Sequence, residues 1–328
     1  MTLIFLPKKS LGRVAFNMRP ARGPWGGSSP FVVQLKHYLH NRGYDVCFDL
    51  RKKVDVIVLI DPRDDLQFKS FGMDEIRAYK KKNPKVKVLH RVNECDQRKD
   101  TKFMDELLKE ANEIADHTVF IARWLLEYHA ERWFNKNISH SVIYNGADPR
   151  VFHPIGSAIY HHRESFRIVT HHWSDNILKG FNEYQKIDQA ISEGELNGIE
   201  LWIIGRWPSE IKWQSARLFA PTQGKKLADL LRSCHAYVTA SRWEPCGMHH
   251  VEGAQCGLPL LYHKDGGGIV EAGERYGLGF GDDNMISAID TLREDYDKYR
   301  NQVLNKSPCG DRMVMEYTNR IQSLIANR

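Results

Sequence analysis

The chain has 328 residues, of which 42% are hydrophobic and 27% are charged. This composition excludes a disordered chain, a collagen-like sequence and a small disulfide scaffold. Because a single core stops growing at roughly 250–300 residues, we expect two domains of similar size with a cleft between them. The net charge of +6 is uneven, since residues 1–150 carry 27 basic and 19 acidic side chains and the remainder carries 20 and 22. Any basic partner surface is therefore expected in the first half.

The cysteine spacing and the lack of a long apolar run predict a cytoplasmic protein. The six cysteines form no CxxC pair and have no zinc-finger spacing. No secretory signal opens the sequence, and no apolar stretch approaches the roughly 20 residues that span a bilayer. Contact with the inner face of a membrane, if it occurs, is expected to be peripheral.

In the first half, a helix is predicted from Ser29, as N-cap, to a C-cap at Gly43, because apolar residues recur there at helical spacing. A second helix is predicted over 104–115. Short apolar runs between such segments indicate buried parallel strands. The predicted strands of this half cover 54–60, 86–89, 117–121 and 141–144.

The second half repeats this alternation, with strands predicted over 166–170, 199–204, 236–239 and 258–262. The class is therefore α/β, with two doubly wound domains whose ligand loops lie at the carboxyl ends of the strands. The predicted division is residues 1–152, a linker over 153–165, a second domain over 166–310, and a last helix within 311–328 that packs back on the first domain.

The segment from Ser241 to Pro259 points most directly to chemistry. It follows a strand, and a short helix is predicted to begin near Gly247. The free N–H groups of Gly247, Met248 and His249 would then favour an anion such as a diphosphate. Glu244 in the preceding loop and Glu252 inside the helix would flank that anion. Two carboxylates beside a diphosphate suit a nucleotide sugar, which carries hydroxyls at both ends.

Several segments, in this order along the chain, resemble the retaining GT-B glycosyltransferases of family four. Those enzymes carry a Glu-x7-Glu signature that is followed by a Gly-Gly-x-x-Glu loop. The resemblance covers about residues 23–282 and implies a GT-B fold, in which two Rossmann-like domains face a central cleft. The matching segments are Gly26-Gly27, Val142–Asp148 with Val151–Pro154, Lys179-Gly180-Phe181, Glu244 with Glu252, and Gly267-Gly268-Ile269-Val270-Glu271.

The resemblance also implies roles for individual residues of the second half. Glu244 would contact the hydroxyls of the donor sugar and Glu252 the ribose, while Lys179 would hold the charge that develops on the leaving phosphate. The loop residues Gly267, Gly268 and Glu271 would also belong to the donor site. The family usually has an arginine five residues before this lysine, and here that position is Ser174. Arg206, after the next predicted strand, is the candidate replacement.

In the first half, Gly26 and Gly27 precede a helix, so their backbone can approach a donor closely. His90 is predicted to end a strand, at the position where the family often places a histidine near the donor sugar, and so becomes a candidate catalytic residue. The polar loop that follows His90 supplies weaker candidates for acceptor contacts, and these are Arg91, Asn93, Asp96 and Arg98.

The function predicted is retaining, metal-independent transfer of a sugar from a UDP- or GDP-linked donor to a glycan, lipid-linked or other hydroxyl acceptor, which could be anionic. No cofactor and no metal are predicted, and neutralisation of the diphosphate would then fall to Lys179, Arg206 and the helix N-terminus. The alternatives are a sugar-nucleotide epimerase or a phosphorylase on the same fold, or a basic binding module without catalysis. Basic clusters at 51–53 and 80–87 could meet anionic lipids, but no nucleic-acid-binding motif accompanies them.

Overall fold

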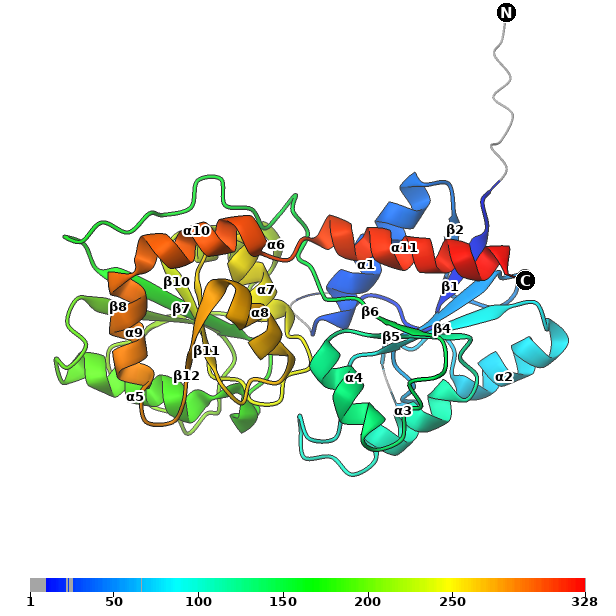
Figure 1. Cartoon of the computed structure of the whole chain (residues 1–328), viewed down its shortest axis with the longest axis horizontal. Coiled ribbons are helices and arrows are strands. Elements are labelled where there is room, and N and C mark those ends of the chain that lie inside the picture. Colours follow the sequence, from blue (N-terminus) through cyan, green and yellow to red (C-terminus); the bar gives the residue numbers. More distant parts are fainter. Residues whose placement is uncertain (1–9, 22, 24–25, 66, 328) are drawn as a thin grey trace, which may run out of the picture.

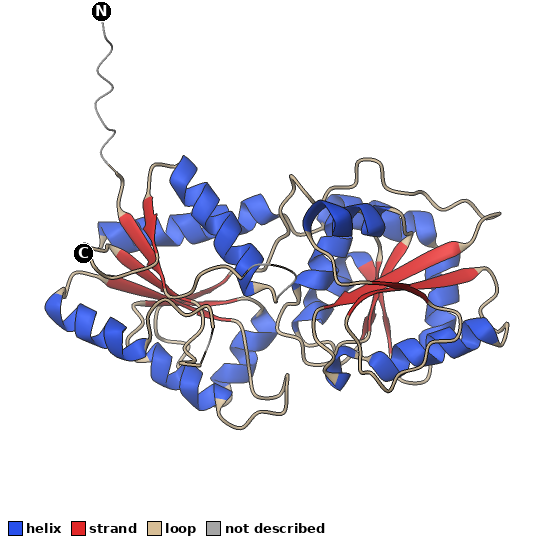
Figure 2. Ribbon diagram, turned by 180° about the vertical axis from the view of Figure 1, so that it is seen from behind, coloured by secondary structure: helices blue, strands red, loops and turns tan. Residues whose placement is uncertain are grey.

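The computed structural model describes residues 10–21, 23, 26–65 and 67–327. It contains two six-stranded sheets, and helices cover both faces of each (Figures 1 and 2). All the strand pairs within these sheets are parallel. The architecture is therefore the predicted GT-B fold, two doubly wound α/β domains side by side.

The first sheet has the strand order β2-β1-β3-β4-β5-β6. Its strands are short and mostly buried, as expected for a sheet covered on both faces. The elements of this domain are β1 (Arg13–Phe16), α1 (Ser28–Asn41), β2 (Asp45–Cys47), β3 (Val56–Leu59), α2 (Met73–Lys82), β4 (Lys87–Val92), α3 (Met104–Asn112), β5 (His117–Phe120), α4 (Arg123–Ala130) and β6 (His140–Val142).

The second sheet has the order β12-β11-β10-β7-β8-β9, so the direction of winding reverses between β7 and β10. Ligands of doubly wound sheets bind at such a reversal, outside the carboxyl ends of the strands. The elements are β7 (Phe166–His172), the 3-10 turn η1 (Ile177–Lys179), α5 (Phe181–Ser192), β8 (Ile199–Gly205), β9 (Arg217–Phe219), α6 (Gly224–Arg232), β10 (Ala236–Thr239), α7 (Met248–Gln255), β11 (Leu260–His263), α8 (Gly268–Tyr276), β12 (Gly277–Phe280), α9 (Met285–Glu294) and α10 (Tyr296–Lys306).

The last helix, α11 (Gly310–Ala326), leaves the second domain and lies along α1 of the first (Figure 1). Its apolar face enters the first core, where Tyr317 meets the ring of Phe31 edge-on at 4.8 Å. Met313, Val314 and Ile321 are buried in the same cluster. The first domain is therefore built from both ends of the described chain.

The structure differs from the sequence prediction mainly at short or terminal elements. The strands β1, β2, β9 and β12 were not predicted, and each has only three or four residues. Helix α1 begins at Ser28 instead of using Ser29 as its N-cap, because the Ser29 hydroxyl accepts a hydrogen bond from the Ala21 N–H at 2.9 Å. The predicted first domain, the family resemblance and the last helix each include residues that lie outside the described ones, which are 1–9, 22, 24, 25, 66 and 328.

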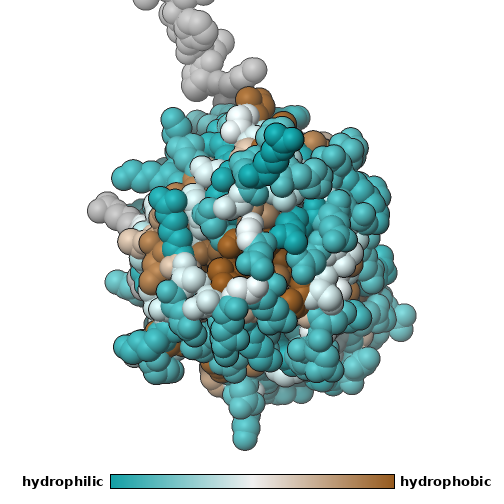
Figure 3. Space-filling model, turned by 90° about the vertical axis from the view of Figure 1, so that its left-hand side faces the viewer, coloured by the Kyte–Doolittle hydropathy of each residue, from teal (hydrophilic) through white to brown (hydrophobic). Residues whose placement is uncertain are grey.

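Among the described helices, none combines the length and the apolar character that crossing a bilayer requires. The end of the molecule on the second domain's side is mainly hydrophilic, with apolar side chains gathered near the centre of that face (Figure 3).

Gly268 is the closest backbone contact between α8 and the signature loop, and replacing it with alanine should destabilise the protein. A Cβ atom there would lie 1.8 Å from the Pro245 carbonyl oxygen and 2.8 Å from the Cβ of Ala122 in the first domain. Overpacking of this kind costs about 1–3 kcal/mol. Urea unfolding should therefore show a lower midpoint for Gly268→Ala. Gly281→Ala is the matched control, because its nearest neighbour, the Asn284 Oδ1 atom, would lie 3.9 Å from the new Cβ; equal losses in the two variants would contradict the steric argument.

Candidate active site

The predicted helix after the signature loop is present as α7, and it begins at Met248 with Gly247 as its N-cap residue. No side chain caps this N-terminus, so its first N–H groups stay available to an anion. Glu244 lies in the loop that joins β10 to α7, and Lys179 ends the turn that follows β7. The two residues therefore meet at the winding reversal of the second sheet.

Lys179, Glu244, Arg98 and Glu94 form one ion cluster where the two domains meet. The Lys179 ammonium group donates a hydrogen bond to Oε2 of Glu244. The Arg98 guanidinium, from the first domain, lies 3.1 Å from Oε1 of the same carboxylate and 2.6 Å from Oε2 of Glu94. Only 6% of the Glu244 side chain and 13% of the Lys179 side chain are exposed. One buried carboxylate thus bridges a cation from each domain.

The pKa values of this cluster follow from burial and charge pairing. Burial alone would raise the pKa of Glu244, but Arg98 and Lys179 outweigh it and lower that pKa to about 2. Burial favours the neutral form of Lys179 and lowers its pKa, although the Glu244 carboxylate acts in the opposite direction. Burial also acts against the charge of Arg98, but the carboxylates of Glu244 and Glu94 raise its pKa. At neutral pH Glu244 is therefore an anion held between two basic groups.

Glu252 lies inside α7, and its Oε2 atom is 2.9 Å from Nε2 of His171, at the end of β7. The Nδ1 atom of His171 is in turn 3.1 Å from the Tyr237 hydroxyl. His249 is also buried, with Nε2 at 3.1 Å from the Thr239 hydroxyl, and burial lowers its pKa well below the usual value. Buried polar side chains thus fix the orientation of Glu252 and of the first turn of α7.

Gly26 and Gly27 approach α7 from the first domain. A Cβ atom on Gly27 would lie 2.7 Å from Cγ of Met248, so the glycine loop packs directly on the N-terminus of α7. A Cβ atom on Gly26 would meet nothing within 4 Å. The side chain of Asn93, after β4, lies 3.1 Å from the Ser28 hydroxyl at the start of α1. These residues gather on the first-domain side of the ion cluster.

The Gly-Gly-x-x-Glu loop contacts both the loop that carries Glu244 and the first domain. Gly267 pairs with Glu244 in a short parallel bridge, and the Gly268 N–H donates to the Glu244 carbonyl at 2.9 Å. Glu271 accepts hydrogen bonds from the first N–H groups of α4 and from the Tyr144 hydroxyl. In this structure Glu271 therefore caps a first-domain helix.

His90 requires a correction. The strand does not end at His90 but continues to Val92, which leaves His90 in the middle of β4 and fully buried. Its Nδ1 atom lies 3.2 Å from Oδ1 of Asn112 at the end of α3, and burial lowers its pKa to about 4. This histidine packs inside the first domain, and its catalytic role stays a prediction.

The weaker candidates that follow His90 have different surroundings. Arg91 is buried, bonds the Asn145 side chain at 2.9 Å and lies over the Phe31 ring. Asp96 accepts hydrogen bonds from the Met104 and Asp105 N–H groups and so caps α3. Only Arg98 reaches the ion cluster. Glu94, which sequence reasoning did not select, is held there with it, and the four-residue spacing between Glu94 and Arg98 is the local signal for this pair.

Arg206, the predicted replacement for the arginine absent at position 174, is exposed and donates to the Trp173 carbonyl at 3.1 Å. The Ser174 hydroxyl accepts from the Asn176 N–H and shapes the turn before η1. The arginine that shares a carboxylate with Lys179 is instead Arg98.

We also searched the described residues for metal ligands. No group of three or more His, Cys, Asp or Glu side chains among them is arranged to hold a metal ion. An Asp-x-Asp sequence occurs at 295–297, where Asp295 pairs with Lys298 at the start of α10.

Known proteins of the same fold match almost the whole chain. Sucrose-phosphate synthase from Thermosynechococcus elongatus is 15% identical with a TM-score of 0.69, and the match covers 97% of this chain and 100% of that one. HepE from Anabaena, solved with UDP and glucose, is 12% identical with a TM-score of 0.66 and coverages of 95% and 99%. The catalytic domain of starch synthase IV from Arabidopsis thaliana, bound to ADP and acarbose, is 12% identical with a TM-score of 0.66 and coverages of 97% and 100%. No curated protein sequence matches the chain.

The two domains have the GT-B architecture, and a family model matches the second of them. Residues 190–303 match the family model described as "Glycosyl transferases group 1", and this region contains Glu244, Glu252 and the Gly-Gly-x-x-Glu loop. The match to this family model therefore lies in the second domain.

Truncating Glu252 should weaken nucleotide binding, if this carboxylate receives the hydroxyls of the ribose. Hydrogen bonds to charged groups contribute about 1.5–3 kcal/mol, which corresponds to roughly a 10- to 150-fold rise in the nucleotide Kd. Isothermal titration of Glu252→Ala measures this change. Glu274→Ala, an exposed position on α8, is the control and should bind normally. An unchanged Kd in Glu252→Ala would remove the carboxylate from the nucleotide site.

Proposed function

We propose that the protein transfers a sugar from a nucleoside diphosphate sugar to a hydroxyl acceptor, with retention of anomeric configuration and without a divalent ion. The observation that carries this proposal is the bridging of Lys179 and Arg98 by Glu244, beside the uncapped N-terminus of α7. Two cations and a set of backbone N–H dipoles in a buried site are the groups that stabilise a leaving diphosphate.

Donor binding would exchange the partners of this ion cluster. The diphosphate would take over Lys179 and Arg98, and Glu244 would then be free to accept hydrogen bonds from the sugar hydroxyls. The carboxylate therefore holds the two cations in place before the donor arrives. The pKa of Glu244 is about 2 while it is paired with Arg98 and Lys179, so the carboxylate is ionised at neutral pH when the donor arrives.

In the transfer step, the bond between the anomeric carbon and the diphosphate oxygen breaks, and a bond from the acceptor oxygen to that carbon forms on the same face of the sugar. The acceptor proton moves to an oxygen of the departing phosphate, so no carboxylate nucleophile is needed. Lys179 and Arg98 stabilise the negative charge that grows on the diphosphate. A metal would be redundant under this proposal, so EDTA should leave the rate unchanged.

A thermal-shift panel of UDP, GDP and ADP with their sugar conjugates tests the donor class. A ligand at 100 times its Kd stabilises the folded state by about 2.7 kcal/mol, which is readily detected. HepE and starch synthase IV were solved with UDP and ADP respectively, so both bases belong in the panel beside GDP. Stabilisation by none of the three nucleotides would contradict the proposed donor site.

The alternatives give different products. Incubation with the donor alone would yield an isomerised sugar nucleotide from an epimerase. An oligosaccharide with inorganic phosphate would yield a sugar 1-phosphate from a phosphorylase. A binding module without catalysis would give salt-sensitive binding to an anionic polymer and no protection by nucleotide sugars. The ion cluster favours transfer, because its two cations are matched to a diphosphate leaving group.

We further propose that the acceptor enters beside Gly26 and the loop after β4, which border the ion cluster. The basic clusters do not border it. Lys81, Lys82 and Lys85 are exposed at the end of α2, and the neighbouring 51–53 segment is joined to them through Tyr79. These basic clusters adjoin the amino end of β4, whereas Glu94 and Arg98 follow its carboxyl end. At about 3.3 Å per residue, this six-residue strand separates its two ends by roughly 17 Å. An anionic membrane would therefore be met at the far side of the first domain.

A further inference from the structure

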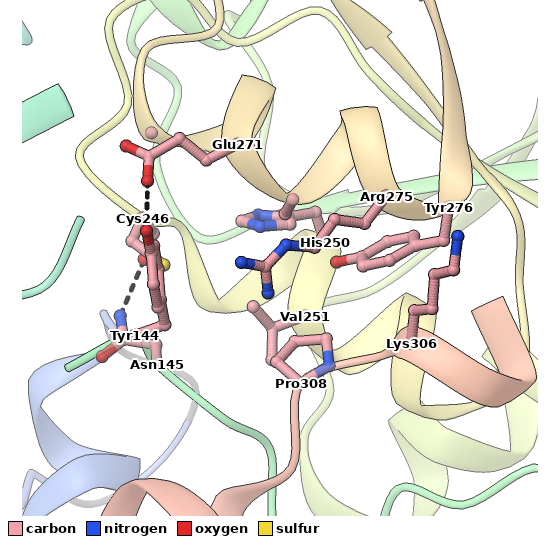
Figure 4. A pocket seen from close by; sticks show the side chains of 12 residues that line it. Tyr144, Asn145, Cys246, His250, Val251, Glu271, Arg275, Tyr276, Lys306 and Pro308 are labelled. Carbon is pink, nitrogen blue, oxygen red and sulfur yellow. Dashed lines mark hydrogen bonds between the residues drawn. The ribbon is translucent and has the colours of Figure 1, made fainter. Parts of the chain in front are cut away.

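A small cavity of about 40 Å³ lies where the domains join, apart from the ion cluster (Figure 4). It is lined from both domains. Tyr144 and Asn145 come from the segment that leaves the first domain, and Lys306 and Pro308 come from the segment that returns to it. Helices α7 and α8 supply the remaining walls. Such a volume exceeds what one water molecule needs.

Two buried polar side chains in this cavity have no protein partner. The two ring nitrogens of His250 have no hydrogen-bond partner among the described residues, and the same is true of the Tyr276 hydroxyl. Both side chains are almost completely buried. Leaving such groups unpaired costs free energy, so native proteins rarely retain them without a ligand or solvent to satisfy them. Burial also lowers the pKa of His250 to about 4, so at neutral pH its ring presents one N–H donor.

A cation lies at the same place. Figure 4 shows the Arg275 side chain extending its guanidinium group into the space between His250, Val251 and Pro308, and the Tyr276 hydroxyl directed toward His250. Arg275 has no carboxylate partner among the described residues, and its guanidinium lies 5.6 Å from the centre of the Tyr144 ring. The lining carboxylate, Glu271, already accepts hydrogen bonds from the N-terminus of α4 and from Tyr144. Arg275, His250 and Tyr276 can therefore each donate a hydrogen bond to a ligand in the cavity.

This cavity lies on the other face of α7 from the donor side. Successive helix residues are about 100° apart, so Met248, His249 and Glu252 fall within one arc of roughly 100°. His250 and Val251 point to the opposite side of the helix. A ligand in the cavity would thus contact α7 without entering the nucleotide site.

We propose that this cavity is a second anion site, which takes a tetrahedral oxyanion, as free phosphate or as the phosphoryl group of a small phosphate ester. Arg275 supplies the charge, and His250 and Tyr276 supply buried hydrogen-bond donors. The anion would bridge α7 and α8 to the two chain segments that cross between the domains. The proposal does not depend on the proposed donor or acceptor.

The test uses inorganic phosphate as the probe and Lys179→Ala as the background, because that variant weakens phosphate binding at the proposed donor site. Isothermal titration of this protein should give saturable binding of one phosphate. Adding Arg275→Gln, at an exposed position, should raise the phosphate Kd roughly tenfold or more. Adding Arg312→Gln, an exposed arginine on α11, should leave it unchanged. A parallel titration with glycerol 3-phosphate distinguishes a phosphate ester from the free ion.

Tyr276→Phe gives a second readout that a merely structural hydroxyl would not produce. Without phosphate, this variant should be at least as stable as its parent, because it loses an unpaired buried hydroxyl. With phosphate, it should lose most of the thermal stabilisation that the parent shows. The proposal is overturned if the Lys179→Ala protein shows no saturable phosphate binding, or if Arg275→Gln and Tyr276→Phe bind phosphate as their parent does.

Discussion

Replacing Lys179 with alanine is expected to lower kcat by roughly 100- to 1000-fold, the usual cost of removing one preorganised group that stabilises a developing negative charge. Lys179 is the second-domain cation of the ion cluster, and it already contacts the carboxylate that the donor would displace. Because the charge on the diphosphate grows as the glycosidic bond breaks, the loss should fall on turnover more than on acceptor KM. Initial rates at saturating donor and acceptor measure it.

The control for this experiment is Lys186→Ala, an exposed lysine on the neighbouring helix α5. It should retain full activity, since it makes no contact with the cluster. Glu244 keeps Arg98 as a partner when Lys179 is removed, so the variant should remain folded. A Lys179→Ala protein with normal kcat and a raised acceptor KM would contradict the phosphate role.

Arg98→Gln should lower kcat by roughly 10- to 100-fold, because it removes the cation that the first domain contributes to the leaving group. Its guanidinium contacts the same carboxylate as Lys179 does, from the opposite domain. The diphosphate would therefore receive both charges only while the domains are closed. Steady-state kinetics of this variant and of Arg77→Gln, a more exposed arginine on α2, give the comparison.

A purely structural role for Arg98 can be separated from this one by adding Ser174→Arg. That substitution places a guanidinium five residues before Lys179, within the second domain itself. If Arg98 supplies charge to the diphosphate, the double variant should regain part of the lost turnover. Lost activity that Ser174→Arg does not restore, together with a lowered unfolding midpoint, would make Arg98 a structural residue.

The fold was predictable because buried parallel strands are apolar along their whole length. The runs around Val56, Val88 and Ile203 are of this kind, and each predicts its strand to within a few residues. The short strands β2 and β9 were missed because β2 is only partly buried and β9 is mostly exposed, so neither carries a continuous apolar pattern. Neighbouring strands decide their pairing, and a local pattern does not report on neighbours.

The candidate site was predictable where its residues lie close together in the sequence. Glu244, Gly247 and Glu252 belong to one loop and helix, so their spacing describes their geometry directly. His90 was expected at the end of its strand, but β4 continues to Val92 and so places His90 in the core. The pairing of Arg98 with Glu244 crosses the domain boundary, and neither residue's surroundings in the sequence indicate the other.

The path of α11 bears on how the protein reaches its folded state. The 17 residues of this helix are synthesised after the strands and helices of the second domain, yet they complete the core of the first domain. Domains generally fold as units during synthesis, with the N-terminal one first. Here the second domain can close its core before the first can, so the α1 surface around Phe31 stays uncovered until α11 has been synthesised.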